Sequence, residues 1–295
     1  MKIGLGTVQF GLDYGITNQK GKINNLEIRR ILELAEMYHI QVLDTAALYG
    51  ESETILGEVL QNDSHFNIIT KTPRFLKSRI TTYDIEQLES AFKYSLAKLQ
   101  RQSIYGLLVH NADDLLSKDA HLLIEKMQSL KLDGFIRKIG VSVYHPDQLA
   151  RILERYTIDL VQIPCNVFDQ RFLTNVNLGK LRQCGIEVHA RSIFLQGTLL
   201  MPFAQLPACF KKKQDHFKAY YDYLFQNQYS ALDAALGFVT QQEDIDCCLV
   251  GVCSVNQLSE ILLALPNMRR IQKEEFLTYA SVDQELINPA RWKTS

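Results

Sequence analysis

The sequence predicts one closed (β/α)8 barrel, an α/β fold of the TIM-barrel type. Eight short, strongly apolar runs alternate with longer runs whose apolar residues recur with the helical period. Parallel strands buried on both faces have this composition, and eight strand–helix units favour a closed barrel over an open doubly wound sheet. The length of 295 residues suits such a barrel, which typically takes about 250 residues. The chain has no evident linker or break in composition, so we expect residues 1–295 to form a single domain.

The expected strands are short runs of aliphatic and β-branched residues, each bounded by turn-forming residues. They comprise residues 2–7, 41–45, 66–71, 104–110, 138–142, 158–164, 186–192 and 246–251.

Helices are expected between these strands, and several carry start or stop signals. Asn24 can cap the first helix, with Glu27 in the position of a capping box. Asp84 can cap a later helix, Pro146 suits a first helical turn, and Gly185 is a C-terminal cap. The expected helices comprise residues 24–38, 55–60, 84–99, 119–131, 146–156, 177–184, 230–241 and 255–264.

Two segments fall outside the repeating pattern. An insertion after strand seven, residues 195–228, is rich in aromatic residues and lysine, and we expect it to be irregular. Connections of this length are more often functional than idle. Within it, the run Lys211–Lys213 is expected to be a solvated loop. The C-terminal tail, residues 266–295, is polar and weakly periodic.

Composition excludes several classes of function. The formal net charge is −1, so no global field directs the chain to nucleic acid or to an anionic membrane. No apolar run approaches the roughly 18 residues that span a bilayer, and the N-terminus lacks a signal-peptide pattern. The six cysteines form no CxxC pair, and no histidine completes a metal-ligand spacing. We therefore expect reduced cysteines, no metal and a cytoplasmic location.

Polar side chains follow consecutive strands at their carboxyl ends, where barrels carry their active sites. Asp44 and Tyr49 follow strand two, Lys71 ends strand three and His110 ends strand four. Each alone has a structural explanation, such as a helix cap, a packed aromatic ring, an ion pair or a core histidine. Together, at neighbouring strand ends, they indicate a proton-transfer site.

The four side chains suit the reduction of a carbonyl group. A phenol has a pKa near 10, and a nearby ammonium lowers it by stabilising the phenolate. We therefore expect Tyr49 to be the general acid, with Asp44 holding Lys71 charged and His110 orienting the substrate oxygen.

The motifs around these residues resemble the aldo-keto reductases. They are "LDTAALYG" followed by "ESETILG", the lysine of "ITKT" and the histidine of "LLVHN", within a likeness that runs from "GLGTVQFG" to "VGVCSVNQLSE". The resemblance implies a reductase of small aldehydes or ketones that uses NADPH, with NADH as the alternative. It also implies that Asp44, Tyr49, Lys71 and His110 form a catalytic tetrad.

The resemblance also implies where the cofactor binds. Ser142, Gln162 and Asn166 match the groups that hold the nicotinamide carboxamide, and the loop after strand seven passes the pyrophosphate. The segment after strand eight matches the part that binds the adenosine end. The residues matched in these last two segments are Ser192, Leu195, Gly197, Gly251, Ser254, Gln257 and Glu260.

The chain departs from the family pattern at three places. Arg191 stands where an aromatic residue often stacks on the nicotinamide, so its guanidinium or Phe194 would have to stack instead. Val143 replaces an asparagine that usually follows Ser142. The adenosine segment lacks the lysine or arginine that clamps the 2′-phosphate, and each lost charge-assisted hydrogen bond is worth roughly 1.5–3 kcal/mol. The preference for NADPH is therefore expected to be weaker than in the family.

Two alternatives remain open from the sequence. The chain could be a regulatory subunit that binds nucleotide and turns over slowly, or an unrelated barrel lyase or metal hydrolase. The last class needs clustered histidine and carboxylate ligands at strand ends, which this chain lacks. We expect the substrate pocket to be lined by residues 10–14, the loop after strand four and the tail with Trp292.

Overall fold

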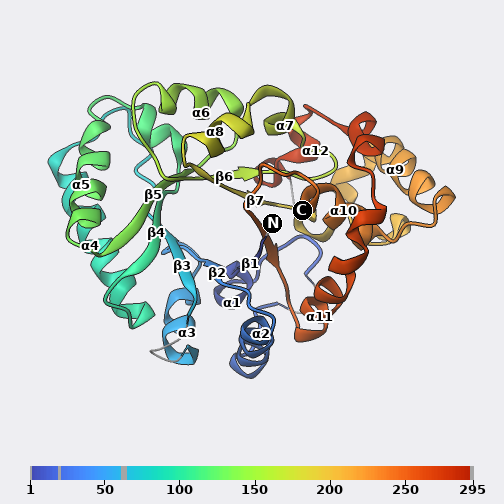
Figure 1. Cartoon of the computed structure of the whole chain (residues 1–295), viewed down its shortest axis with the longest axis horizontal. Coiled ribbons are helices and arrows are strands. Elements are labelled where there is room, and N and C mark those ends of the chain that lie inside the picture. The colour runs from blue at the N-terminus through green and yellow to red at the C-terminus, as the bar shows by residue number, and fades with distance from the viewer. Residues whose placement is uncertain (1, 19–20, 61–64, 293–295) are drawn as a thin grey trace.

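The computed structural model describes residues 2–18, 21–60 and 65–292. Eight parallel strands close into a barrel in chain order, because β1 pairs with both β2 and β8. Figure 1 looks into this ring of strands, with the helices arranged around it. The predicted barrel is confirmed. The strands are β1 (Lys2–Gly6), β2 (Val42–Asp44), β3 (Asn67–Lys71), β4 (Ile104–Val109), β5 (Ile136–Ser142), β6 (Leu160–Pro164), β7 (Glu187–Arg191) and β8 (Cys247–Gly251).

The barrel interior has its own apolar core, separate from the larger core between strands and helices. Alternate strand residues point to the same face, so inward positions on five of the strands supply this plug. Gly4 makes room for it, because a Cβ there would lie 2.8 Å from the Cys247 sulfur. The plug comprises Val42, Ile69, Leu108, Leu160, Cys247 and Leu249.

The same alternation places the polar side chains of the mouth. Two residues beyond four of the plug residues, the chain carries an inward polar side chain at the carboxyl end of the barrel. The steps are Val42 to Asp44, Ile69 to Lys71, Leu108 to His110 and Leu160 to Gln162.

The helices around the barrel agree with the predicted ones, with one error in capping. The Asn24 side chain accepts a hydrogen bond from the Glu27 backbone amide, as predicted. Thr81, and not Asp84, is the N-cap of the helix after β3, and the Asp84 carboxylate accepts from the Thr81 amide. The helices are α2 (Asn25–Met37), α3 (Ser52–Val59), α4 (Thr82–Leu99), α5 (His121–Leu132), α6 (Pro146–Leu153), α8 (Leu178–Gln183), α10 (Ala231–Thr240) and α11 (Val255–Ala264), with the short α1 (Val8–Gly11) and α7 (Arg171–Asn175) not predicted.

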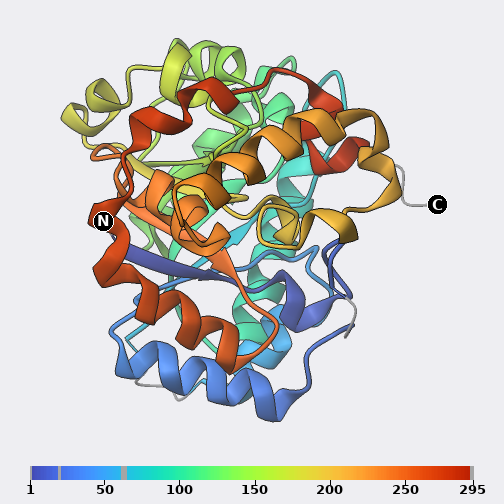
Figure 2. The same cartoon turned by 90° about the vertical axis from the view of Figure 1, so that its right-hand side faces the viewer.

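The prediction of an irregular insertion is wrong for its second half. Residues 214–226 form helix α9 (Gln214–Gln226), which buries Phe217, Tyr220 and Leu224 against the body of the protein. The tail, which includes the short helix α12 (Gln284–Ile287), packs on this insertion, and Figure 2 views this side of the molecule. The Tyr220 ring lies 5.8 Å from the Tyr279 ring. The insertion and the C-terminal tail therefore bury part of each other's surface.

Two expectations about these segments are also wrong. Trp292 packs its ring 4.9 Å from Phe210, and does not reach the cavity at the barrel mouth. Lys213 is not simply solvated, because its ammonium pairs with Asp283 of the tail.

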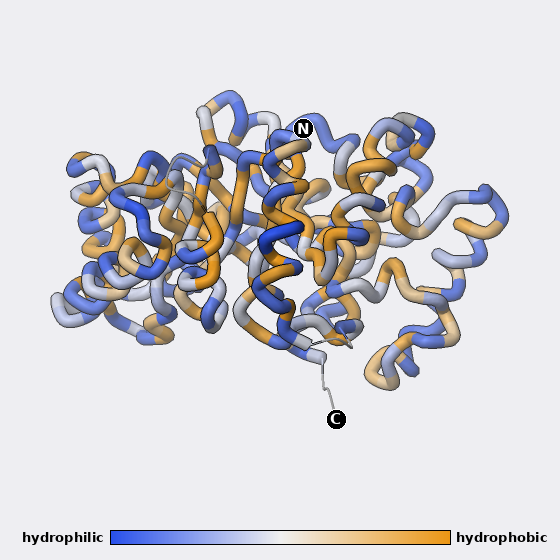
Figure 3. Tube along the Cα trace, turned by 90° about the horizontal axis from the view of Figure 1, so that it is seen from below, coloured by the Kyte–Doolittle hydropathy of each residue, from blue (hydrophilic) through white to orange (hydrophobic). Residues whose placement is uncertain are grey.

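The exterior is polar along its helices, and Figure 3 shows hydrophilic stretches recurring there. None of the described helices combines the length and apolar character needed to cross a membrane. The six cysteines are thiols, and the described part of the chain contains no group of three side chains that could hold a metal ion.

Candidate active site

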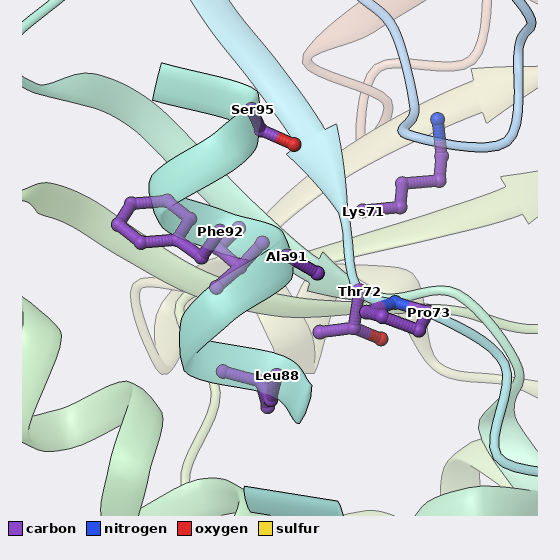
Figure 4. A pocket seen from close by; sticks show the side chains of 8 residues that line it. Lys71, Thr72, Pro73, Leu88, Ala91, Phe92 and Ser95 are labelled. Atoms are coloured by element: carbon purple, nitrogen blue, oxygen red, sulfur yellow. The ribbon is translucent and has the colours of Figure 1, made fainter. Parts of the chain in front are cut away.

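A cavity of about 830 Å³ opens at the carboxyl ends of the strands. The four predicted catalytic residues, Asp44, Tyr49, Lys71 and His110, all line it. A second, smaller void lies between β3 and α4 and is too small to hold a water molecule. Figure 4 shows that the Lys71 side chain points away from α4. Lys71 also lines the larger cavity at the barrel mouth.

The Lys71 ammonium is buried and held by three oxygen atoms. It lies 2.7 and 2.8 Å from the two Asp44 carboxylate oxygens and 2.8 Å from the Thr45 carbonyl oxygen. Burial alone would lower the pKa of Lys71, but the Asp44 carboxylate and Tyr49 together raise it. The amine is therefore charged in this site.

Tyr49 contacts this ammonium, with 3.3 Å between its hydroxyl oxygen and the Lys71 nitrogen. The sequence predicted that the ammonium would lower the phenol pKa, and the Lys71 charge does act in that direction, but it does not decide the net shift. Burial raises the pKa of Tyr49 by more than the Lys71 charge lowers it. Tyr49 therefore carries its proton at neutral pH.

His110 lies edge-on to Tyr49, with the ring centroids 6.1 Å apart and the planes at 88°. Burial, and then the positive charges of Lys71, Arg74 and Arg191, lower the pKa of His110 to about 2. The imidazole is therefore neutral. Its Nε2 lies 3.1 Å from a guanidinium nitrogen of Arg74, and its buried Nδ1 has no hydrogen-bond partner among the described residues.

Gln162 sits behind the ion pair. Its amide nitrogen donates to an Asp44 carboxylate oxygen at 2.7 Å, which fixes the side chain. Its amide oxygen is buried and lacks a partner among the described residues. This leaves a buried acceptor within the lining of the cavity, next to Ser142 of β5.

The structure brings seven of the ten predicted cofactor residues to the cavity. Asn166 is buried instead, donating to the Ser192 carbonyl and accepting from two backbone amides. Leu195 is buried, and the Ser254 hydroxyl caps α11. The seven lining residues are Ser142, Gln162, Ser192, Gly197, Gly251, Gln257 and Glu260.

The guanidinium of Arg191 is held in place by two neighbouring residues. Its guanidinium lies 4.2 Å from the centre of the Tyr144 ring and donates to the Val143 carbonyl oxygen at 3.0 Å. Phe194, the other candidate for stacking on the nicotinamide, also lines the cavity.

Sequence reasoning missed the contact that joins the loops after β1 and β7 across the mouth. The Gln196 side chain accepts from the Ile16 amide and donates to the Tyr14 hydroxyl, at 3.1 and 3.0 Å. Gly197 has a φ of +85°, and a Cβ there would lie 2.3 Å from the Thr17 hydroxyl oxygen. A glycine after a polar residue in this loop was the one available signal.

Arg74 was also missed, because it lies in a loop three residues beyond the strand end. It lines the cavity and contacts His110, although nothing in "KTPR" marks it as more than a surface arginine.

Comparisons with known proteins agree with this geometry. The model of the aldo/keto reductase family matches residues 2–284, so the chain belongs to that family. It is therefore an NAD(P)H-dependent oxidoreductase, of a family that reduces carbonyl compounds.

Three relatives illustrate the likeness. The uncharacterized oxidoreductase YqkF of Bacillus subtilis (strain 168) is 26% identical over 296 residues, covering 93% of this chain and 90% of the relative. The holo form of the aldo-keto reductase AKR11C1 from Bacillus halodurans superimposes with a TM-score of 0.75 at 20% identity, covering 98% and 95% of the two chains. The glycerol dehydrogenase AKR11B4 from Gluconobacter oxydans gives a TM-score of 0.70 at 21% identity, covering 97% and 93%. At these identities the two structures support the fold alone.

Proposed function

We propose that this protein reduces an aldehyde or ketone, with Tyr49 donating the proton that completes the alcohol. The observation that carries the proposal is the 3.3 Å contact between the Tyr49 hydroxyl and an ammonium that Asp44 fixes in place. When bound, the reduced nicotinamide supplies the hydride. The protein supplies the proton, the fixed charge and the orientation.

The proton transfer follows from the charges. Tyr49 is protonated at rest, because burial raises its pKa. As negative charge develops on the substrate oxygen, the phenol gives up its proton, and the adjacent Lys71 cation stabilises the phenolate that remains. Asp44 keeps that cation in place through two carboxylate contacts.

The residues that line the cavity fit a nicotinamide nucleotide. The buried Gln162 oxygen is an acceptor awaiting a donor, and a carboxamide NH2 provides one. Ser142 lies beside it in the β5–β6 register. Ser192 and Gly197 are placed for the phosphates, since barrels commonly bind phosphate in the loops after strands seven and eight.

The adenosine end favours a relaxed choice between NADPH and NADH. The cationic side chains among the described lining residues are Lys71, Arg74 and Arg191, all outside the segment after β8. In that segment, the charged side chain that lines the cavity is the carboxylate of Glu260. A 2′-phosphate would meet a carboxylate rather than a clamp, so we expect NADH to bind within about tenfold of NADPH, a difference of about 1.4 kcal/mol. The cysteine thiols fit a reducing cytoplasm.

A titration with NADPH and, separately, NADH tests the assignment. The single tryptophan, Trp292, lies outside the cavity, so the fluorescence of the reduced nucleotide is the better signal. We expect both nucleotides to bind and both to support the reduction of a carbonyl compound. Binding without turnover would favour a regulatory subunit, and no binding of either nucleotide would overturn the proposal.

A further inference from the structure

Arg74 carries a positive charge that the described part of the protein does not neutralise. Its one hydrogen-bond contact is with His110 Nε2, and no carboxylate among the described residues pairs with it. Its neighbours in the same loop behave differently, since Lys77 pairs with Asp84 and Arg79 pairs with Asp119. The unpaired cation is the one that lines the cavity.

The charges around the reacting end of the cavity do not cancel. Lys71 is offset by Asp44, which leaves Arg74 and Arg191 in excess. The other carboxylate among the described lining residues, Glu260, belongs to α11 at the opposite end. Arg191 ends β7, and its guanidinium is held by the Val143 carbonyl and the Tyr144 ring, whereas Arg74 follows β3 and has its one hydrogen-bond contact with His110. Arg74 is therefore the cation left for a substrate.

The contact with His110 also constrains the imidazole. A guanidinium can only donate, so His110 Nε2 must be the acceptor and Nδ1 must hold the ring proton. In this state Nε2 cannot donate a hydrogen bond to a substrate oxygen. His110 becomes available to the substrate when Arg74 turns to another acceptor, and a carboxylate is a stronger acceptor for a guanidinium than a neutral imidazole.

We infer that Arg74 binds the carboxylate of an acidic carbonyl substrate, a 2-oxo or 3-oxo acid, and thereby frees His110 to contact the carbonyl oxygen. The inference rests on the proposed function. The 3.1 Å between Arg74 and Nε2 sets the short spacing, because the carboxylate and the carbonyl oxygen must occupy adjacent positions. The hydride adds to the carbonyl carbon and the Tyr49 proton to its oxygen, so a 2-oxo acid becomes a 2-hydroxy acid with the carboxylate unchanged.

Kinetics with a matched pair of substrates test the inference. Phenylglyoxylate carries the carboxylate, and its methyl ester keeps the same carbonyl without the charge. We expect Arg74→Met to lower kcat/KM for the acid about 10- to 100-fold, as for the loss of charge-assisted hydrogen bonds, and to change it for the ester less than about threefold. Arg74→Lys should recover part of the loss, since an ammonium keeps the charge without the planar fork.

Arg79→Met is the control, because it removes a cation from the same loop that is already paired with Asp119. It should leave both substrates unchanged. An equal loss on acid and ester in Arg74→Met, or a wild type that does not favour the acid, would overturn the inference while leaving the reductase intact. Reduction of neither substrate would count against the proposed function.

A binding readout separates the two cases further. Phenylglyoxylate titrated into the enzyme–nucleotide complex should bind more weakly to Arg74→Met than to Arg79→Met, whether or not turnover follows. Equal dissociation constants in the two variants would also overturn the inference.

Discussion

Two arginines in this protein contact a histidine ring nitrogen at nearly the same distance, and they differ in everything else. Arg74 lies 3.1 Å from His110 Nε2, and Arg171 lies 3.0 Å from His145 Nδ1. Arg171 is buried and bound through two nitrogens to Asp169, at 2.8 and 2.7 Å. Arg74 is exposed at the cavity and has no such carboxylate among the described residues.

The difference separates a structural contact from a functional one. Breaking a buried ion pair leaves an uncompensated charge, so the Arg171 group fixes local structure. It joins α7 to His145, the N-cap of α6. A cation held at a cavity without a counter-ion contributes little to folding and is available to a ligand. The contact distance alone would not distinguish the two.

The largest effect is expected from breaking the buried ion pair between Arg171 and Asp169. Arg171→Met leaves the Asp169 carboxylate buried without its partner and should lower the free energy of unfolding by about 3–5 kcal/mol. Urea unfolding measures this. The activity per folded molecule should not change, because Arg171 lies outside the cavity. A loss below about 1 kcal/mol would mean that this pair is not structural.

The next effect concerns pH and His110. Burial, with Lys71, Arg74 and Arg191, lowers its pKa in the folded state to about 2, against about 6.5 when unfolded. Below about pH 6.5 the unfolded state therefore binds more protons at His110 than the folded state does. The free energy of unfolding is highest above that pH and falls as the pH falls. From pH 7 to pH 5 the loss should be about 2 kcal/mol.

His110→Gln tests this dependence, since glutamine does not titrate in this range. Unfolding at the two pH values should differ by about 2 kcal/mol less in the variant than in the wild type. Identical pH dependence in the two proteins would mean that His110 titrates normally in the fold.

The smallest effect is expected at the other arginine. Arg74→Met should change the free energy of unfolding by no more than about 0.5 kcal/mol, as for other exposed positions. The same chemical denaturation as for Arg171→Met gives the comparison directly. Substantial destabilisation would make Arg74 a second structural arginine and remove its distinction from Arg171.

The sequence was sufficient for the barrel and for the four groups at its mouth. Strand residues alternate between faces, so a polar residue two positions after an apolar inward residue can be placed from the pattern, as with Ile69 and Lys71. How deeply each side chain is buried could not be predicted from the pattern in the same way. The direction in which the Lys71 charge moves the pKa of Tyr49 was predictable, but the larger and opposite effect of burial was not.

Loop contacts between distant segments were also out of reach. Gln196 and Tyr14 are separated by nearly the whole barrel in sequence, and no periodic pattern links them. Asp169 lies only two residues before Arg171, but the burial that makes their ion pair structural, and its lack at Arg74, could not be read from the sequence. Helix α9 had a readable period in Phe217, Tyr220 and Leu224, but its many polar residues concealed it.

The central claim is that Tyr49 completes a hydride transfer to a carbonyl group. The most direct measurement follows deuterium from the reduced, deuterated nicotinamide into methyl phenylglyoxylate in a single turnover, by mass spectrometry of the alcohol. Wild type should label the alcohol, and Tyr49→Phe should do so about 10²- to 10⁴-fold more slowly. Tyr105 lies at the start of β4, and its hydroxyl donates to Glu187. The control variant Tyr105→Phe should match the wild type. Equal labelling rates in Tyr49→Phe and wild type, or no label in any of the three proteins, would contradict the claim.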